Sequence, residues 1–407
     1  MKTSSIRALT SRSLAALSAT AMAGMTALSA AALPQNGGIS MLPARSPIAE
    51  EVHVFHNWIL MPIMTAISVF VLGLLGWIVI RYNSKANPKA AQFSHNTLIE
   101  VIWTGVPILI LLFISLFSFE LLFKEDRMPD GKQMIAEISR SQSTFSFEND
   151  FNARRTVKNA GHLDVLRVSA GNDVARLKHR KDFTVEGFGE EVLEISLNEP
   201  AVSGERIIIR GGRTRVGPGK ILGLFGEDRS EIALRPTVTV KATGKQWFWQ
   251  YSYPEFGDFE FIALMKPREE TTEELYLYET TNHVVLPVGE SIRLITTAAD
   301  VIHAWAMPAF AVKIDAVPGR NNETWFKANR TGMYYGQCSE ICGKDHAFMP
   351  IAVKVVTRPE FEAWVDEQRA LAGLDPMFTG DNVQIAGADN VQPTNSQHGA
   401  QQTDTIN

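Results

Sequence analysis

Two cysteines, Cys338 and Cys342, lie four residues apart and are the only cysteines in the 407-residue chain. His346 follows Cys342, Met349 follows His346, and His303 lies upstream at the expected start of a strand. Thiolates, imidazoles and a thioether are the soft ligands that select copper in proteins. The residue types and their spacing therefore predict a copper site.

Two other uses of the cysteines are weighed against copper. Two cysteines in an exported protein would ordinarily form a disulfide, but the histidines and the methionine nearby argue against that pairing. A structural zinc site more often uses a third cysteine or a second cysteine pair, and it does not need methionine. Zinc therefore stays the alternative metal.

The number of thiolates decides which copper site is predicted. A mononuclear blue-copper site takes one cysteine, two histidines and a methionine, whereas this chain offers two cysteines. Both thiolates can bridge two copper ions, which leaves one histidine for each ion. Met349 can then be a weak axial ligand, and a backbone carbonyl between the cysteines can serve the other ion. Such a site changes little on reduction and suits electron transfer.

The N-terminal third predicts export and membrane insertion. Residues 1–32 have a basic start, an apolar middle and a small-residue end, as in a secretory signal peptide; an uncleaved amphipathic N-terminus is the alternative. Residues 58–80 and 101–119 carry no charged side chain. Two such segments in tandem predict membrane spans at 58–80 and 101–122 rather than buried core helices.

The two prolines of the spans and the charges between them complete the expected topology. Pro62 and Pro107 are expected near the starts of their helices, where a missing amide donor costs little. The connector 81–100 carries basic residues, which the positive-inside tendency places in the cytoplasm. Residues 33–57 and everything beyond about Leu122 then face the periplasm of a bacterial inner membrane.

The periplasmic part divides into three regions. Residues 124–235 are charged and glycine-rich, with strand-like runs at 192–197 and 206–210, and predict either a separate module or a partly ordered excursion. Residues 236–371 predict an all-β sandwich or barrel closed by a helix over 358–371, with strands expected at 237–242, 283–287, 291–297 and 351–356. The polar tail 372–407 predicts disorder.

Charge and one glycine-rich run exclude other functions. The net charge of −5 becomes three units more negative if Lys2, Arg7 and Arg12 leave with the signal peptide. An acidic chain argues against nucleic acid and for a basic partner. The run 217–223 is a turn rather than a phosphate loop, because no Ser or Thr follows Lys220 and Pro218 lacks an amide donor.

These features together resemble subunit II of a cytochrome c oxidase of the haem–copper family, of the copper-containing bacterial aa3 type. The hairpin and residues 236–357 carry the likeness, and residues 338–349 are similar to the family's dinuclear CuA signature. The resemblance implies a two-helix transmembrane hairpin followed by an all-β cupredoxin-like sandwich or barrel, with an inserted module of unknown fold.

The resemblance also implies the ligands. Cys338 and Cys342 would bridge the two copper ions. One ion would also take His303 and Met349 as ligands. The other ion would take His346 and the backbone carbonyl of Glu340.

Three more roles follow from the resemblance. The side chain of Glu340 would reach a magnesium ion shared with subunit I; a plain surface acid is the alternative. Trp247 would be the residue at which electrons enter, although alternate aromatics of the stretch 247–253 can also pack the core. Glu100 would lie at the entrance of a proton path; a helix-start acid favoured by the macrodipole is the alternative.

Two features depart from the family pattern. The family usually has serine after the first copper histidine, where this chain has Ala304. Residues of about 131–235 have no counterpart in the common pattern, and their role is open.

The implied function is one part of a larger reaction. The chain would accept electrons from cytochrome c at CuA and pass them to haem in subunit I, in a complex with subunits I and III that reduces oxygen to water and pumps protons. Acidic residues would steer the cytochrome, namely Glu255, Asp258, Glu260, Asp315 and Asp345.

Three other protein classes are compared with this interpretation. A quinol oxidase subunit II lacks the copper ligands, and a nitrous-oxide reductase is soluble and has a large His-rich domain. A membrane-tethered copper carrier or assembly protein is the remaining alternative, although it would not need Trp247 or Glu100.

Overall fold

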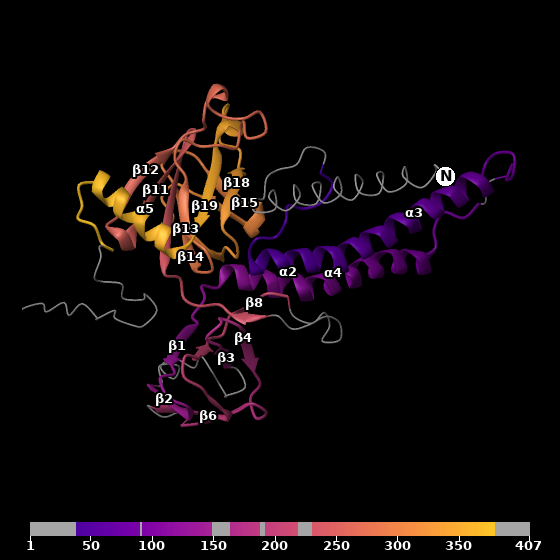
Figure 1. Cartoon of the computed structure of the whole chain (residues 1–407). Helices are drawn as coiled ribbons and strands as arrows, with labels where there is room; N and C mark the ends of the chain where they lie inside the picture. Colours follow the sequence, from indigo (N-terminus) through magenta and orange to yellow (C-terminus); the bar gives the residue numbers. More distant parts are fainter. Residues whose placement is uncertain (1–37, 90–91, 149–162, 188–191, 219–229, 379–407) are drawn as a thin grey trace, which may run out of the picture.

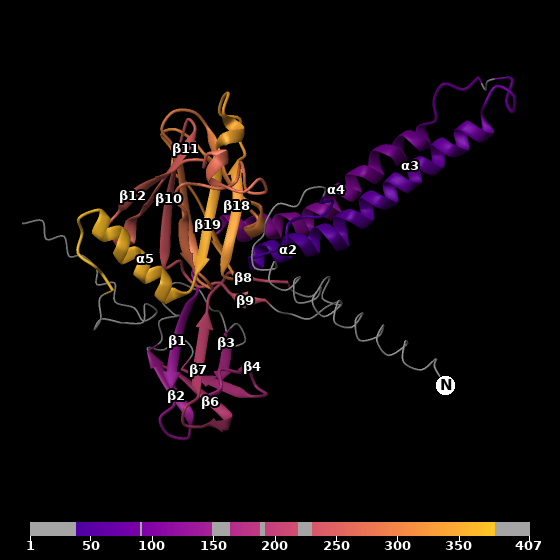
Figure 2. The ribbon, with the colours of Figure 1, turned by 45° about the horizontal axis from the view of Figure 1, so that its top comes forward.

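A helical hairpin and two β units make up the molecule. The computed structural model describes residues 38–89, 92–148, 163–187, 192–218 and 230–378. A β-sandwich, coloured orange to yellow, and a smaller β module, coloured magenta, lie at the same end of the hairpin (Figure 1). The second view shows the same separation of the two units (Figure 2). The predicted signal peptide and most of the predicted tail lie outside the described residues.

The hairpin consists of two long helical runs. The first comprises α2 (Pro47–Phe55), a π-helical segment η1 (His56–Leu60) and α3 (Met61–Arg81), and the second is α4 (Thr97–Asp126). Both runs are long and apolar enough to cross a membrane. Most side chains along α3 and α4 are exposed and apolar, which fits contact with lipid or with other membrane helices.

Both helical runs begin earlier than the apolar pattern indicates, because polar residues cap them. The hydroxyl of Ser46 accepts a hydrogen bond from the amide of Ala49 at 3.0 Å, and the Asn96 side chain accepts one from the amide of Ile99 at 3.2 Å. The expectation that Pro107 lies near a helix start is therefore wrong, since it lies inside α4. Pro62 lies in the first turn of α3, as expected, but the helical segments α2 and η1 lead into α3 without a break.

The sandwich holds two five-stranded sheets, in the orders β12-β11-β10-β14-β17 and β13-β19-β18-β15-β16. It is the expected cupredoxin-like domain. The strands predicted from sequence are confirmed. The bounds are β10 (Val238–Lys245), β11 (Phe248–Tyr253), β12 (Phe259–Ala263), β13 (Val284–Pro287), β14 (Ser291–Ala298), β15 (His303–Met307), β16 (Val312–Ala316), β17 (Asn322–Lys327), β18 (Gly332–Cys338) and β19 (Pro350–Val356).

Alternating side chains fill the space between the two sheets. On β10, Val238, Val240 and Ala242 are buried, as the period of a strand requires. The predicted closing helix is confirmed as α5 (Arg358–Leu371), which begins at a capping box and buries Phe361 and Val365 against the sheets.

The inserted region forms a module with a hydrophobic core of its own, made by side chains such as Phe145, Val165, Phe183 and Ile207. Its two sheets have the orders β1-β7-β3-β4 and β2-β6-β5. The predicted runs are confirmed as strands β6 and β7. The bounds are β1 (Lys132–Glu137), β2 (Gln142–Glu148), β3 (Asp164–Val168), β4 (Val174–Leu177), β5 (Phe183–Glu186), β6 (Val192–Ala201), β7 (Arg206–Gly211), β8 (Arg215–Val216) and β9 (Glu231–Ile232).

The sandwich is joined directly to the end of the hairpin. The indole nitrogen of Trp325 donates to the carbonyl of Lys124 at 2.9 Å, and the hydroxyl of Thr324 donates to the carbonyl of Glu125 at 3.1 Å. These carbonyls belong to the last turn of α4. The carbonyl groups of a last turn have no hydrogen-bond partner within their own helix. At the start of α2, the Ser46 hydroxyl donates to the carbonyl of Phe310 at 2.8 Å. Residues of the sandwich thus bond both ends of the hairpin that lie beside it.

The chain leaves the hairpin and returns to the sandwich at adjacent points. The amide of Gly131 donates to the carbonyl of Ala233 at 3.2 Å, and the amide of Arg235 donates to the carbonyl of Gly131 at 2.8 Å. A Cβ atom on Gly131 would lie 2.2 Å from the Ala233 carbonyl oxygen, so glycine is required for this close approach. The module therefore begins and ends at one place in the structure.

Replacing residues 133–210 by an Asn-Gly turn should leave the hairpin and the sandwich folded. Lys132 and Gly211 are already antiparallel partners, and Asn-Gly suits a two-residue hairpin. We expect the free energy of unfolding of the sandwich to change by less than about 1 kcal/mol, measured by denaturant titration of the purified protein.

A larger deletion of residues 133–233 is the matched comparison. It also removes Val216 and Ala233, which pack with Ile48 and Trp325, and it should destabilise the joint. Equal loss of stability in both deletions would show that the module is an integral part of the fold.

Candidate metal centre

The two cysteines lie at the end of the sandwich, in the loop that connects β18 to β19. Cys338 is the last residue of β18, and its amide donates to the carbonyl of Met349 at 3.0 Å, which closes the loop at its base. The amide of Ser339 donates to the carbonyl of Ala304 at 3.0 Å and so ties the loop to β15. His303 is the first residue of β15. Three strands thus bring the predicted ligands together.

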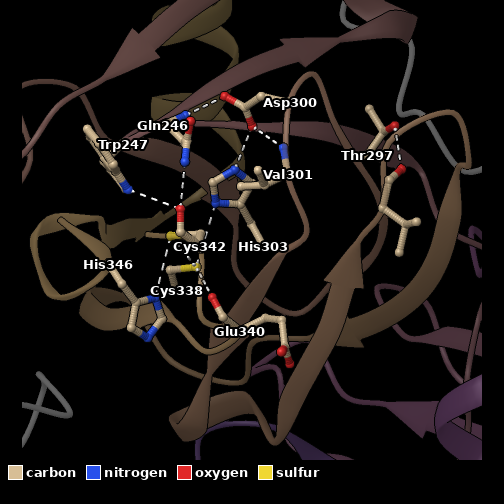
Figure 3. Close-up of polar contacts among 11 residues, drawn as sticks. Gln246, Trp247, Thr297, Asp300, Val301, His303, Cys338, Glu340, Cys342 and His346 are labelled. Carbon is tan, nitrogen blue, oxygen red and sulfur yellow. Dashed lines mark hydrogen bonds and ion pairs between the residues drawn. The ribbon is translucent and has the colours of Figure 1, made fainter. Parts of the chain in front are cut away.

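The sulfur atoms of Cys338 and Cys342 lie 3.9 Å apart, and both thiols are free. This separation is well beyond the length of about 2.05 Å of a disulfide. Nδ1 of His303 lies 3.9 Å from the Cys338 sulfur, and Nδ1 of His346 lies 3.5 Å from the Cys342 sulfur (Figure 3). Each thiol therefore has one imidazole beside it.

The donor set fits soft metal ions. The donor atoms of His303, Cys338 and Cys342 all lie within 4.8 Å of one another. Half of the sulfur–sulfur separation is shorter than a metal–thiolate bond of about 2.3 Å, so an ion on either side of the line between the sulfurs can bond both. The carbonyl oxygen of Glu340 lies 3.4 Å from the Cys338 sulfur, and Met349 is buried in the same core cluster.

Burial and hydrogen bonding move the pKa values of the two thiols apart. Burial opposes ionisation of Cys338, but hydrogen bonds from His303 and from backbone groups lower its pKa to about 7. Burial and the neighbouring Cys338 sulfur raise the pKa of Cys342 to about 12. Two adjacent buried thiolates therefore require added positive charge, which metal ions can supply.

Asp300 orients His303 and was not predicted from sequence. Its Oδ1 lies 3.0 Å from Nε2 of His303, which leaves Nδ1 directed at the Cys338 sulfur. A carboxylate on the far nitrogen of a ligand histidine is a common device in metal sites. Asp300 is in turn held by the amides of Gln246 and Val301, each at 2.7 Å.

Gly244 on β10 lets the His303 ring approach the strand closely. A Cβ atom at this position would lie 2.6 Å from the ring carbon Cδ2 of His303. Only the absence of a side chain therefore allows the buried imidazole to occupy this place. The sequence does offer a signal for Asp300, because it is an acid three residues before a predicted ligand histidine. It offers none for Gly244, whose contact with His303 joins strands that are distant in the sequence.

Trp247 lies beside the cysteine loop and not in the core. Its indole nitrogen donates to the carbonyl of Cys342 at 3.3 Å, and the side-chain amide of Gln246 donates to the same carbonyl at 2.8 Å. Trp247 is half-buried, whereas Trp249 and Tyr251 of the same stretch are buried in the sandwich. The prediction that alternate aromatics of this stretch pack the core is thus confirmed for Trp249 and Tyr251.

The remaining predicted residues lie apart from the sulfurs. The Glu340 side chain points away from the cysteines, while its carbonyl faces them (Figure 3). Glu100 lies in the first turn of α4, at the end of the hairpin away from the sandwich (Figure 1). Ala304 is fully buried, so the serine hydroxyl usual at this position has no counterpart here.

Two family models match the chain. The model described as cytochrome c oxidase subunit II, transmembrane domain, matches residues 34–121, and the model of the periplasmic domain matches residues 238–356. The two matches fall on the hairpin and on the sandwich. The inserted module lies between them.

Curated relatives match over most of the chain. A probable cytochrome c oxidase subunit 2 of Rickettsia felis is 32% identical over 341 residues, which are 83% of this chain and 75% of the relative. Cytochrome c oxidase subunit 2 of Cereibacter sphaeroides is 30% identical over 379 residues, which are 86% of this chain and 90% of the relative.

One solved structure matches the sandwich at higher identity. The periplasmic domain of subunit II of cytochrome oxidase of Bradyrhizobium japonicum is 56% identical, with a TM-score of 0.32, and the match covers 34% of this chain and 96% of that one. The two family models and the long curated matches are sufficient to assign the family. The chain belongs to the cytochrome c oxidase subunit II family, and it is a component of a haem–copper oxidase with a periplasmic, cupredoxin-like copper domain.

Proposed function

We propose that this chain relays electrons from a cytochrome c to haem in subunit I through a dinuclear copper centre. The observation that carries the proposal is the pair of buried sulfurs 3.9 Å apart, each with its own imidazole. Two copper ions held by these residues would accept and release one electron at a time. The ligands would be Cys338 and Cys342 with, in addition, His303, Met349, His346 and the carbonyl of Glu340.

The chain's own residues prepare this centre. Asp300 fixes the orientation of His303, and the two strands β18 and β19 fix the separation of the loop ends. Burial of both sulfurs keeps water away from them. These features limit the movement of the ligands, which favours rapid electron exchange.

Trp247 is the proposed point at which electrons enter. Its half-buried ring offers apolar area for a docking partner, and its N–H reaches the backbone of Cys342 directly. The path from the surface to a ligand residue thus crosses one hydrogen bond. Acidic residues such as Asp345, within the cysteine loop, favour a basic cytochrome.

Other parts of the proposal concern the assembled enzyme. The Glu340 side chain, directed away from the sulfurs, would contribute to a magnesium site shared with subunit I. Glu100 would lie at a proton-path entrance on the cytoplasmic side. We infer contacts with subunits I and III, in a bacterial inner membrane that the chain crosses twice, with 81–100 cytoplasmic and the copper domain periplasmic.

The copper prediction can be tested on the purified oxidase. The subunit should bind two coppers and show a purple, valence-delocalised dicopper signal. The change His346→Gln should abolish this signal, because it removes the imidazole that lies 3.5 Å from the Cys342 sulfur. Metal analysis and electron paramagnetic resonance measure both results.

The change His179→Gln is the matched control, since that histidine packs on Phe183 in the inserted module. It should leave the copper signal unaltered. A single blue-copper signal in the unmodified protein, or exchangeable copper without oxidase activity, would favour a membrane-tethered copper carrier instead.

The change Asp300→Asn should weaken copper binding by about 10- to 100-fold, the usual effect of losing a carboxylate behind a ligand histidine. Competition with a copper chelator measures the affinity, and Asp258→Asn, at an exposed position, serves as control. Equal affinities in the two variants would show that Asp300 does not orient the ligand.

The change Trp247→Phe should slow electron transfer from reduced cytochrome c by about tenfold, the factor expected from losing about 1.4 kcal/mol at a contact. Stopped-flow absorbance follows the reaction, and the dicopper signal should stay the same. Trp364→Phe, at another half-buried indole on α5, should not alter the rate. A rate loss common to both variants would argue for a general effect on folding.

A further inference from the structure

A cavity of about 570 Å³ lies where the outer end of α4 meets the inserted module. The helix contributes side chains from its last turns, and the module contributes the segment around β8 and the residue before β9. The lining residues are Glu120, Phe123, Lys124, Arg127, Arg213, Thr214, Arg215, Gly217 and Ser230. Four basic side chains and one carboxylate thus surround one space.

Acidic side chains hold three of the basic groups in place, and Lys124 bonds Glu51 at 2.8 Å and Glu120 at 3.2 Å. Arg213 bonds Asp130 at 2.6 Å, with side-chain exposures of 53% and 17%. Arg215 bonds Asp164 at 3.1 Å, with exposures of 37% and 6%. A guanidinium has five N–H donors, so each arginine keeps donors for a ligand while an acid fixes its position. The cavity lining therefore combines these N–H donors with the one carboxylate of Glu120.

One further basic side chain lines the cavity. Arg127 follows the last turn of α4, is exposed, and forms no ion pair with any residue that the structure describes. A phosphate in the cavity would pair with Arg127.

The position of the cavity favours a lipid over a free anion. It lies at the end of a helix long and apolar enough to span a bilayer. Directly along that helix, Phe119, Leu122 and Phe123 are 56%, 53% and 62% exposed. A ligand with a phosphate at the cavity and an acyl chain on these side chains would match both surfaces.

We propose that this cavity binds the phosphate headgroup of an anionic phospholipid in the outer leaflet. The inserted module supplies Arg213 and Arg215, and the end of α4 supplies Lys124 and Arg127. The site uses no residue of the metal centre. It gives the module a role in fixing the hairpin to the membrane surface.

The test uses the whole oxidase, purified in detergent and depleted of lipid. The complex is mixed with phosphatidylglycerol or with phosphatidylcholine of the same acyl chains, and retained lipid is counted by native mass spectrometry. We expect one phosphatidylglycerol held more tightly than phosphatidylcholine. The change Arg127→Gln should weaken retention roughly fivefold, the factor that about 1 kcal/mol per basic residue gives.

Arg140→Gln is the matched control, because Arg140 is an exposed arginine of the module outside the cavity. It should retain the lipid like the unmodified complex, and the dicopper signal should be the same in all three proteins. Equal retention of the two lipids, or equal retention by the two variants, would overturn the proposal. Displacement of phosphatidylglycerol by the same concentration of inorganic phosphate would show a free-anion site and would also overturn it.

Discussion

The close burial of two sulfur atoms is the constraint on which the rest of the centre depends. Separated by 3.9 Å and almost fully covered, the two thiolates would repel each other in a medium that solvates charge poorly. The surrounding chain must therefore hold them in place and also bring imidazoles beside them. Strands β18 and β19 meet the first requirement, and His303 and His346 meet the second.

The sandwich transmits this constraint to the membrane. β17, in the sheet opposite β18, bonds the last carbonyls of α4 through Trp325 and Thr324. The start of α2 is bonded to Phe310. The cysteine loop and the helices are thus parts of one hydrogen-bonded framework, and the height of the loop above the helix ends is set by strand length.

Much of this architecture follows from local sequence, and the rest depends on contacts between distant segments. The ligand spacing around Cys338, the strand alternation and the amphipathic pattern of residues 358–371 are local patterns, and they predicted the loop, the strands and the helix α5. Gly244 and Gln246 could not be assigned roles in this way, because they reach the site only when β10 pairs with β14. The helix starts at Ser46 and Asn96 are set by single capping residues outside the apolar runs. The module's sheet order depends on pairings such as β1 with β7, which no local pattern specifies.

The adjacent positions of Gly131 and Arg235 have a consequence for the history of the chain. Because the backbone returns to the place from which it left, a segment between these points can be gained, lost or exchanged in one genetic event without shifting any strand of the sandwich. The lineage could therefore alter what the subunit presents at the membrane surface while the ligand loop stayed under separate selection.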